Sequence, residues 1–211
     1  MALFQRRPDI GHNITFTTYG MNKTLLIVGL GNIGDEYVGT RHNVGFMCVD
    51  EFASKNDFGP WVNKTDMKCL LTQATIGETR VILCKPTTFM NLSGEAVQVV
   101  AHFYKIELQH VIAVHDELDI DFGQVRMRSG GSSAGHNGVK SLTKHLTEGY
   151  GRIRVGIGPK TPDQIDSADF VLQKFNSKEV ENLPKLKKEV AAILSELAYG
   201  SPLSPETRTF L

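Results

Sequence analysis

Short apolar runs alternate with segments of helical periodicity along this chain, and this alternation constrains the fold more than any other feature. Residues 25–30 and 111–115 are apolar runs of strand length, which is typical of strands buried on both faces. Four longer segments show helical spacing: residues 43–54, 93–105, 137–146 and a last helix that ends near residue 198. The alternation predicts an α/β domain with a twisted, mainly parallel sheet and helices on both faces.

Other segments make the predicted sheet mixed. Residues 67–75 and 79–85 flank a short link, which predicts an antiparallel hairpin. Residues 124–129 alternate polar and apolar side chains, as a half-exposed strand does, and alternation is also seen in residues 152–158. In the second of these strands, Arg152 and Arg154 are predicted to face outward.

One domain accounts for most of the chain. No linker-like change in composition interrupts residues 21–211, which are therefore predicted to form a single α/β domain. Residues 1–20 lack the apolar region of a secretory signal, and we interpret them as an extension, a tag or an alternative start. Ser93 is a candidate N-cap for the second helix, and Pro184 is expected to set or kink the first turn of the last one.

The composition argues against several classes of protein. No segment approaches the roughly 18 apolar residues of a membrane span. The three cysteines each lie in an apolar run without a C-x-x-C pair, which argues against a disulfide framework or a zinc site and favours a reducing, cytoplasmic location. The 23 basic and 23 acidic residues balance, so the global basic excess that usually accompanies nucleic-acid binding is missing.

The charges are unevenly distributed, however. Residues 122–160 contain seven basic residues and one acidic residue, a local charge of +6. Arg126 and Arg128 lie on one face of a predicted strand because side chains alternate along strands. The Gly/Ser-rich residues 129–138 lead into a helix and are a candidate phosphate cradle, although they lack the Gly-Lys-Ser/Thr of a nucleotide-hydrolysing loop. A charged strand face is usually only solvated, but the combination favours a polyanion such as RNA.

Residues capable of chemistry follow the predicted strand ends, where open α/β sheets bind ligands. His42 lies in the loop after the first strand, and Asp116 is expected at the edge of a later strand. A carboxylate there can accept the Nδ1–H of a histidine and hold its tautomer. The alternatives are a structural histidine and an acidic turn that is solvated or binds a cation.

Two further loops offer amide and apolar groups. Residues 29–34, GLGNIG, resemble a dinucleotide-binding glycine motif, but no helical pattern begins at Gly34 and acidic residues follow it. Alternatively, the glycines let this loop approach a substrate and present the amide of Asn32. In residues 87–94, Phe89 and Met90 are either core or an apolar wall, and Asn91 can hold a carbonyl group. Two alternative functions stay open at this point: a nucleotide-dependent oxidoreductase built on the glycine loop, and a non-catalytic RNA-binding protein that uses the basic segment.

Taken together, these segments resemble the bacterial-type peptidyl-tRNA hydrolase family. The resemblance covers residues 25–197 and rests on the order and spacing of residues 28–32, 41–43, 86–94, 115–119, 135–138 and 152–158. It implies an α/β monomer, without membrane attachment, that hydrolyses the ester between a peptide and the 3′ end of tRNA and releases the tRNA. The sequence shows no evident metal-ligand cluster, so we expect activity without a metal or cofactor.

The resemblance also implies residue roles. His42 matches the catalytic base and Asp116 its partner, and Asn32, Asn91 and Asn137 match the amide groups of the peptide site. Other lining positions are matched by Tyr37, Phe89, Met90 and His136, and the basic residues expected to bind tRNA are Arg126, Arg128, Lys140 and Arg154. The chain departs from the family at Ile33, where proline is usual, at Asp121 and Phe122, which replace a proline-containing turn, and at Ser132, which replaces a common glycine.

A mechanism follows as a hypothesis. Asp116 orients His42, and the neutral imidazole takes a proton from the water that attacks the ester carbonyl. Asn91 or Asn32 binds the substrate, and one of them stabilises the developing oxyanion. A free, charged α-amine would be poorly satisfied among neutral amides, which would spare aminoacyl-tRNA.

Overall fold

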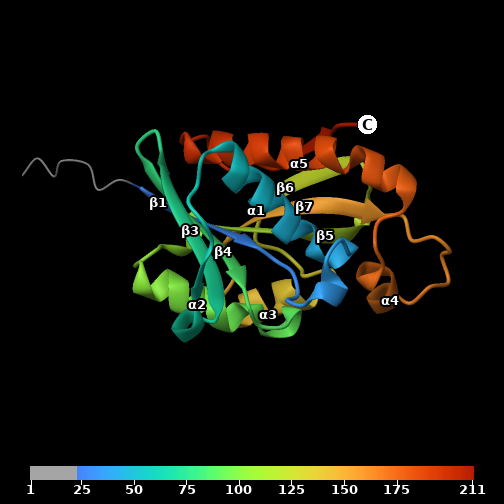
Figure 1. Cartoon of the computed structure of the whole chain (residues 1–211), viewed down its shortest axis with the longest axis horizontal. Helices are drawn as coiled ribbons and strands as arrows, with labels where there is room; N and C mark the ends of the chain where they lie inside the picture. Colours follow the sequence, from blue (N-terminus) through green and yellow to red (C-terminus); the bar gives the residue numbers. More distant parts are fainter. Residues whose placement is uncertain (1–22) are drawn as a thin grey trace, which may run out of the picture.

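A computed structural model of the chain describes residues 23–211 and shows a sheet between two layers of helices (Figure 1). The prediction for residues 1–20 lies outside the described residues. The eight strands have the order β2-β3-β4-β1-β5-β7-β6-β8. Their bounds are β1 Thr24–Gly29, β2 Val62–Lys64, β3 Cys69–Ile76, β4 Thr79–Pro86, β5 Val111–Asp121, β6 Gln124–Ser129, β7 Gly151–Gly158 and β8 Glu206–Thr209.

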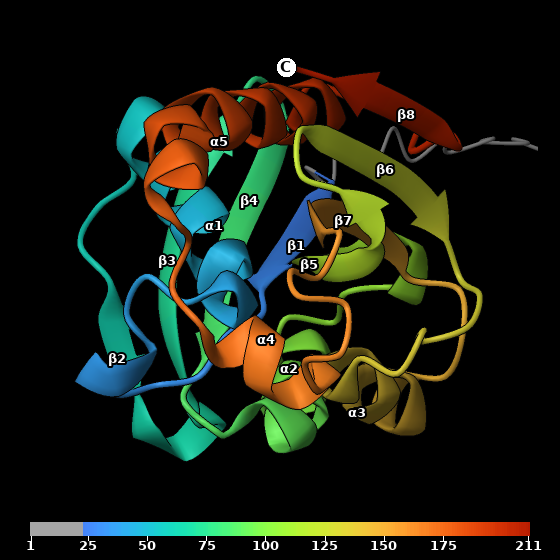
Figure 2. The same cartoon turned by 90° about the vertical axis from the view of Figure 1, so that its right-hand side faces the viewer.

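The helices cover both faces of the sheet, as predicted. They are α1 Val44–Lys55, α2 Ser93–Phe103, α3 Asn137–Leu146, α4 Ser167–Leu172 and α5 Ser177–Ala198. Helices α1 and α5 lie together on one face, and α2 and α3 lie on the other (Figures 1 and 2). None of the helices within residues 23–211 combines the length and apolarity that crossing a membrane requires.

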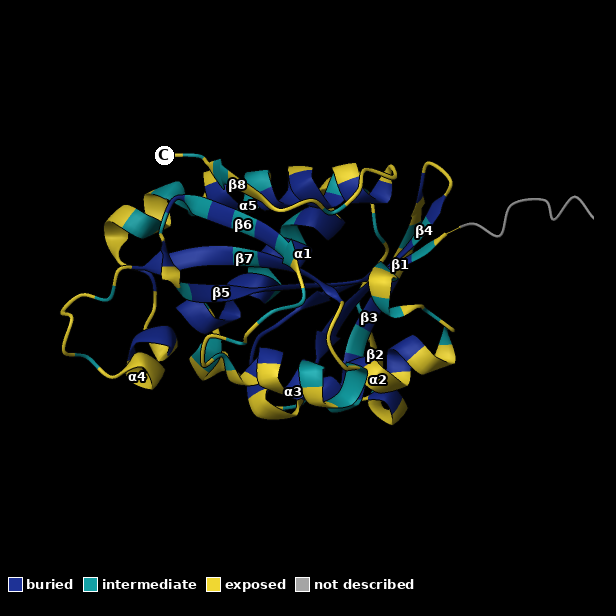
Figure 3. Ribbon diagram, turned by 180° about the vertical axis from the view of Figure 1, so that it is seen from behind, coloured by how far each residue is buried: buried dark blue, intermediate teal, exposed yellow. Residues whose placement is uncertain are grey.

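The sheet is mixed, with parallel strands at its centre and antiparallel strands at both edges. Strands β4, β1, β5 and β7 run parallel, while β3 pairs antiparallel with β4 and β6 antiparallel with β7. The predicted hairpin is therefore present. The central strands are buried on both faces (Figure 3), which explains why β1 and the start of β5 read as uninterrupted apolar runs.

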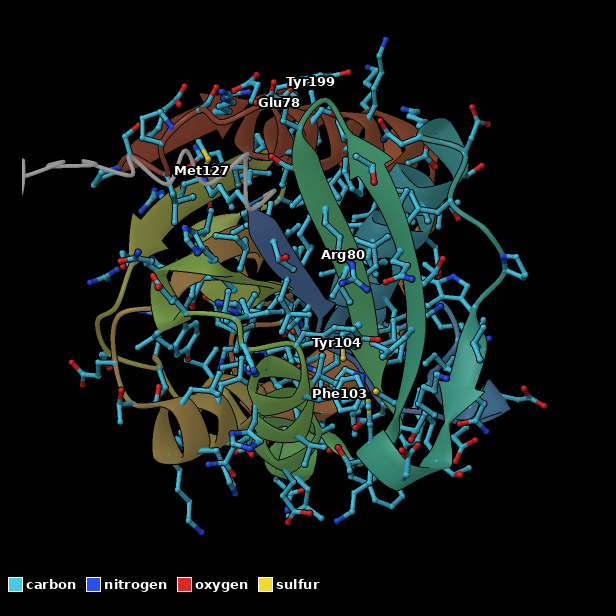
Figure 4. All side chains as sticks on the ribbon, turned by 90° about the vertical axis from the view of Figure 1, so that its left-hand side faces the viewer. Glu78, Arg80, Phe103, Tyr104, Met127 and Tyr199 are labelled. Carbon is cyan, nitrogen blue, oxygen red and sulfur yellow. The ribbon has the colours of Figure 1, made fainter. Side chains whose placement is uncertain are left out.

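Two apolar cores hold the layers together, one on each face of the sheet. The first joins β1, β5 and β7 to α1 and α5, and the second joins β1 and β4 to α2 and α3. At the amino-terminal end of the parallel strands, the Arg80 guanidinium stacks over the Tyr104 ring at 5.1 Å (Figure 4). The ring of Phe103 packs edge-on against Tyr104, with 4.9 Å between centroids. These contacts fasten β4 to the end of α2.

Several local predictions need correction. Ser93 does not cap α2, since its hydroxyl donates to the carbonyl of Met90 in the preceding turn. Pro184 lies well inside α5, which begins earlier because Asn176 and Glu179 form a reciprocal capping box. Helix α4 and the carboxyl-terminal strand β8 were not predicted at all, because both are too short for periodicity to show.

Candidate active site

The site lies beside the part of β5 that extends past the end of β1. Pairing with β1 ends at Val114, whereas β5 continues along β7 and reaches Asp121. Asp116 therefore lies inside a strand and not at its edge, where the sequence pattern had placed it. The space next to β5, beyond the end of β1, lets residues from both faces of the sheet reach the Asp116 carboxylate.

His42 reaches this carboxylate from the 3₁₀ turn Arg41–Asn43, directly before α1. A glycine at position 45 makes the approach possible, because a Cβ there would lie 2.6 Å from the backbone nitrogen of Leu30. The Nδ1–H of His42 donates to Asp116 Oδ1 at 2.9 Å and Oδ2 at 3.0 Å. Since an ionised carboxylate only accepts hydrogen bonds, Nδ1 carries a proton, and in the neutral ring Nε2 then has the free lone pair.

The histidines around Asp116 keep its carboxyl group ionised. Burial raises the pKa of Asp116, but His136 and His42 outweigh it and hold that pKa well below its usual range. His136 Nε2 donates to Asp116 Oδ1 at 2.9 Å. The buried aspartate thus stays charged and can orient and stabilise an imidazolium at His42.

His115, the residue before Asp116, makes stability depend on pH. Burial lowers the pKa of His115 well below its ordinary 6.5, so the folded protein keeps this ring neutral at pH values where the unfolded chain protonates it. The free energy of unfolding should therefore fall as the pH drops below about 6.5, with about 1.4 kcal/mol per pH unit due to this residue. Urea unfolding of the wild type and of His115→Asn, between pH 5 and 7, measures the difference.

Asparagine suits this comparison because it can still donate to the backbone carbonyl of Asp116, which accepts from His115 Nδ1 at 2.7 Å. His102→Asn, an exposed histidine on α2, serves as the control and should show the wild-type pH dependence. Equal slopes for the wild type and His115→Asn would remove His115 from the acid sensitivity.

Asn32 presents an amide donor to the same site. Its Oδ1 accepts from the backbone N–H of Met90 at 2.8 Å, so the side-chain Nδ2 protons face other partners. Asn43 makes two hydrogen bonds to the backbone of Asn32. The Asn32 N–H donates to Asn43 Oδ1 at 2.8 Å, and Asn43 Nδ2 donates to the Asn32 carbonyl at 2.9 Å. Sequence reasoning gave Asn43 no role of its own, because contact between two loops leaves no local pattern.

A cavity of about 1090 Å³ opens over these groups. The predicted residues that line it are Asn32, His42, Phe89, Met90, Asn91, Asp116, His136 and Asn137. Tyr37 is half-buried in the turn Asp35–Tyr37 and does not line the cavity. The opposite wall, which the sequence did not reveal, consists of Pro159, Lys160 and residues of α4.

Arg41 ties the turn that carries His42 to this opposite wall. Its guanidinium stacks over Phe170 of α4 at 4.3 Å and pairs with Glu179 of α5 at 2.7 Å. It also donates to the carbonyl of Lys174 at 2.9 Å. These partners lie more than 120 residues away in the chain, which is why sequence reasoning missed them.

One cluster within residues 23–211 has the composition of a metal site, although none was expected from the sequence. The ligand atoms of His42, Asp116 and His136 lie within 4.8 Å of one another. However, His136 Nδ1 accepts from the backbone N–H groups of Gly138 and Val139, at 3.1 and 3.3 Å. A metal at Nε2 would force the ring proton onto Nδ1, against those two donors. The three residues therefore suit a hydrogen-bonded cluster better than a metal.

The Gly/Ser-rich loop also differs from expectation. Arg152 is buried rather than outward-facing, and its guanidinium donates to the carbonyls of Gly130, Gly131 and Ser132. His136 occupies the N–H groups at the start of α3. The predicted phosphate cradle is thus wrong in its detail, because the helix start already has an acceptor.

None of the predicted tRNA-binding residues lines the cavity; they lie on β6, β7 and α3. Arg126 on β6 stands opposite Arg154 on β7, and Arg128 follows on the same face of β6. Arg154 Nε donates to the buried Glu117 at 3.0 Å, which offsets part of its charge. Arg126 and Arg128 are half-exposed, and Lys140 on α3 is exposed. These three residues keep charges that no ion pair within residues 23–211 offsets.

Comparison with known proteins shows the family of the chain. The family model described as peptidyl-tRNA hydrolase matches residues 26–207. The chain belongs to the peptidyl-tRNA hydrolase family. It is 46% identical over 172 residues to the peptidyl-tRNA hydrolase of Pseudarthrobacter chlorophenolicus, covering 81% of this chain and 87% of that protein. It is 45% identical over 176 residues to that of Paracoccus denitrificans, with coverages of 83% and 73%.

Solved structures show the same fold. The crystal structure of peptidyl-tRNA hydrolase from Acinetobacter baumannii superimposes with a TM-score of 0.78 at 34% identity, covering 86% of this chain and 91% of that one. The Arg119Gln mutant of the same protein gives a TM-score of 0.79 at 33% identity. The predicted family and the single α/β domain are confirmed.

Membership in the peptidyl-tRNA hydrolase family also confirms the predicted enzyme class, hydrolysis of peptidyl-tRNA with release of tRNA. The oxidoreductase and the non-catalytic RNA-binding protein are thereby excluded. The structure explains why the glycine motif misleads: residues 29–34 lead into a 3₁₀ turn, and the first helix begins only at Val44. A dinucleotide site would need a helix start at the end of the glycine loop.

Proposed function

We propose that His42 is the general base of peptidyl-tRNA hydrolysis and that Asp116 orients it. The hydrogen bond of His42 Nδ1 to Asp116, in a residue that lines the cavity, carries this proposal. Nε2 takes a proton from water as the water oxygen attacks the ester carbonyl carbon. The resulting imidazolium, stabilised by Asp116, then returns the proton to the ribose oxygen that leaves with the tRNA.

Asn32 is the best placed donor for the developing oxyanion. Its amide orientation is fixed by Met90 N–H, so its Nδ2 protons are available in the cavity without rearrangement. Asn91 and Asn137 are exposed residues in the cavity lining and suit the neutral groups of a peptide backbone. A substrate with a free ammonium group would find neutral amides there, which supports preference for acylated aminoacyl groups. Phe89 and Met90 supply an apolar wall.

Incubation of the enzyme with an N-acetyl-aminoacyl-tRNA tests the function directly. Chromatography should show release of the N-acetyl amino acid and of free tRNA, and activity should persist after treatment with a chelator. The same tRNA carrying an unacylated amino acid is the matched comparison, and it should react much more slowly. Equal rates on the two substrates would contradict the proposed role of the asparagine amides.

Arg126, Arg128, Lys140 and Arg154 are proposed to bind the tRNA backbone. Replacing Arg126 and Arg128 together by glutamine should weaken tRNA binding and lower the slope of log K against log salt by about 1 for each phosphate that is no longer neutralised. Filter binding at several salt concentrations measures that slope. The control is Lys185→Gln with Lys188→Gln, two exposed residues of α5. An unchanged slope in the arginine variant would remove both side chains from the RNA surface.

We also propose that the enzyme acts as a monomer in the cytoplasm. The monomer is what the resemblance to the peptidyl-tRNA hydrolase family implies. The three cysteines are buried and unpaired, which is consistent with a reducing compartment. Light scattering of the purified protein would test the oligomeric state.

A further inference from the structure

We propose that His136 is a positioning residue that connects the amino terminus of α3 to Asp116 and so controls how Asp116 holds His42. From the sequence, His136 was expected only as part of the peptide-site wall. The inference rests on the proposed role of His42 as base. It assigns His136 an effect on the rate of the reaction, in place of an effect on substrate binding alone.

The first half of the connection is a helix cap. His136 stands at the N-cap of the ten-residue helix α3, and its Nδ1 accepts from the backbone N–H groups of Gly138 and Val139. The positive end of the α3 dipole also lies at this position. A nitrogen that accepts two N–H groups cannot itself hold a proton, so the neutral ring is fixed with its proton on Nε2.

The second half is a hydrogen bond to the catalytic carboxylate. The Nε2–H of His136 donates to Asp116 Oδ1 at 2.9 Å, and the same oxygen accepts from His42 Nδ1 at 2.9 Å. The His136 side chain is only 6% exposed, and its ring lies 4.9 Å from that of His42. Asp116 Oδ1 is therefore shared between a donor with a fixed tautomer and the base.

Sharing has a chemical consequence. The Nε2–H of neutral His136 stabilises part of the negative charge on Asp116. Asp116 therefore favours the protonated, inactive form of His42 less strongly than it would without His136. It also prevents the carboxylate from rotating away from His42. Loss of the Nε2–H would concentrate the charge on His42 alone and free the carboxylate to turn.

Other titratable groups surround His42, Asp116 and His136, and the experiment must leave these neighbours unchanged. His115 and Glu117 flank Asp116 on β5, and the ring of His115 meets that of His136 edge-on at 4.8 Å. From β7, Arg154 pairs with Glu117, and the positive charge of Arg152 contributes to lowering the pKa of His115. None of these residues is changed in the experiment.

Two substitutions separate the two halves of the connection. The side-chain oxygen of asparagine can replace Nδ1 as the cap, but its amide is too short to reach Asp116. The amide nitrogen of glutamine can replace Nε2 as the donor, but glutamine is a poor cap. His136→Asn therefore keeps the cap without the donor, and His136→Gln keeps the donor without the cap.

The proposal predicts different losses of activity for the two variants. For His136→Asn, kcat should fall about 10-fold with little change in KM, and the acid limb of kcat/KM should move to higher pH by about 0.5–1, while Tm also falls because the buried carboxylate loses a donor. For His136→Gln, kcat should stay within about threefold of the wild type although Tm falls by about 2–4 °C. Steady-state kinetics from pH 5 to 8 and thermal unfolding provide these values.

Each alternative role predicts a different outcome. If His136 only caps α3, His136→Asn will match the wild type in kcat and in pH profile. If it only lines the peptide site, both variants will raise KM without changing kcat or the pH profile. Either result would overturn the proposal. His42→Ala tests the base separately: an active His42→Ala would refute the proposed function, whereas an inactive one with a wild-type-like His136→Asn would refute only the positioning role.

Discussion

Replacing His42 by alanine is expected to lower kcat by about 10²–10⁴-fold, the usual loss when a general base is removed. The reason is geometric: Asp116 holds the Nδ1–H of His42, which leaves Nε2 as the basic atom of a residue that lines the cavity. KM should change little, because no role in holding the peptide is assigned to the ring. Release of N-acetyl amino acid from N-acetyl-aminoacyl-tRNA under saturating substrate measures the effect.

Two controls separate loss of the base from loss of structure. His42→Asn retains an N–H that can donate to Asp116 but has no basic nitrogen, and it should be as inactive as His42→Ala. His102→Ala removes an exposed histidine of α2 and should leave kcat unchanged. Turnover near the wild-type level in a folded His42→Ala would show that another group takes the proton from water.

Asp116→Asn is expected to reduce kcat by about 10²–10⁴-fold and to destabilise the fold as well. The carboxylate accepts N–H groups from both His42 and His136, whereas an amide has one acceptor oxygen and brings its own donor. One histidine must therefore lose its partner or change its tautomer. A change at His42 moves the proton to Nε2, where it blocks the base.

Kinetics and urea unfolding of Asp116→Asn should be read together. Asp121→Asn, an exposed carboxylate at the end of the same strand, is the matched control and should affect neither property strongly. A variant at position 116 that unfolds like the wild type and turns over normally would show that the carboxylate is dispensable to His42.

Several of the proposed site residues could be placed from the sequence because they follow strands that periodicity reveals. Asn32 comes after β1, Asn91 after β4, and the carboxyl ends of these strands meet β5 at one edge of the sheet. Resemblance to a family then supplied the roles. Asp116 was placed at a strand edge because four of the residues 116–121 are acidic, which hides the continuation of β5 along β7.

Features that depend on tertiary contact were beyond sequence reasoning. Alternation in residues 152–158 suggested that Arg152 faces solvent, but the loop carbonyls of residues 130–132 provide a buried guanidinium with the acceptors it needs. Helix α4 is too short to show periodicity, so the second wall of the cavity was missed. Likewise, no local pattern shows that His136 accepts the first backbone N–H groups of α3.

The attachment of Arg41 makes the cavity adaptable on one side only. Arg41 of the turn bearing His42 makes a part-buried ion pair with Glu179 and stacks over Phe170, and both contacts restrain this turn against α4 and α5. Accommodation of peptides of different size must then come from the facing rim, where Phe89 and Asn91 are exposed and carry no comparable restraint among the contacts of residues 23–211. The distance between the base and the ester is thereby protected from the variation in size that the peptide brings.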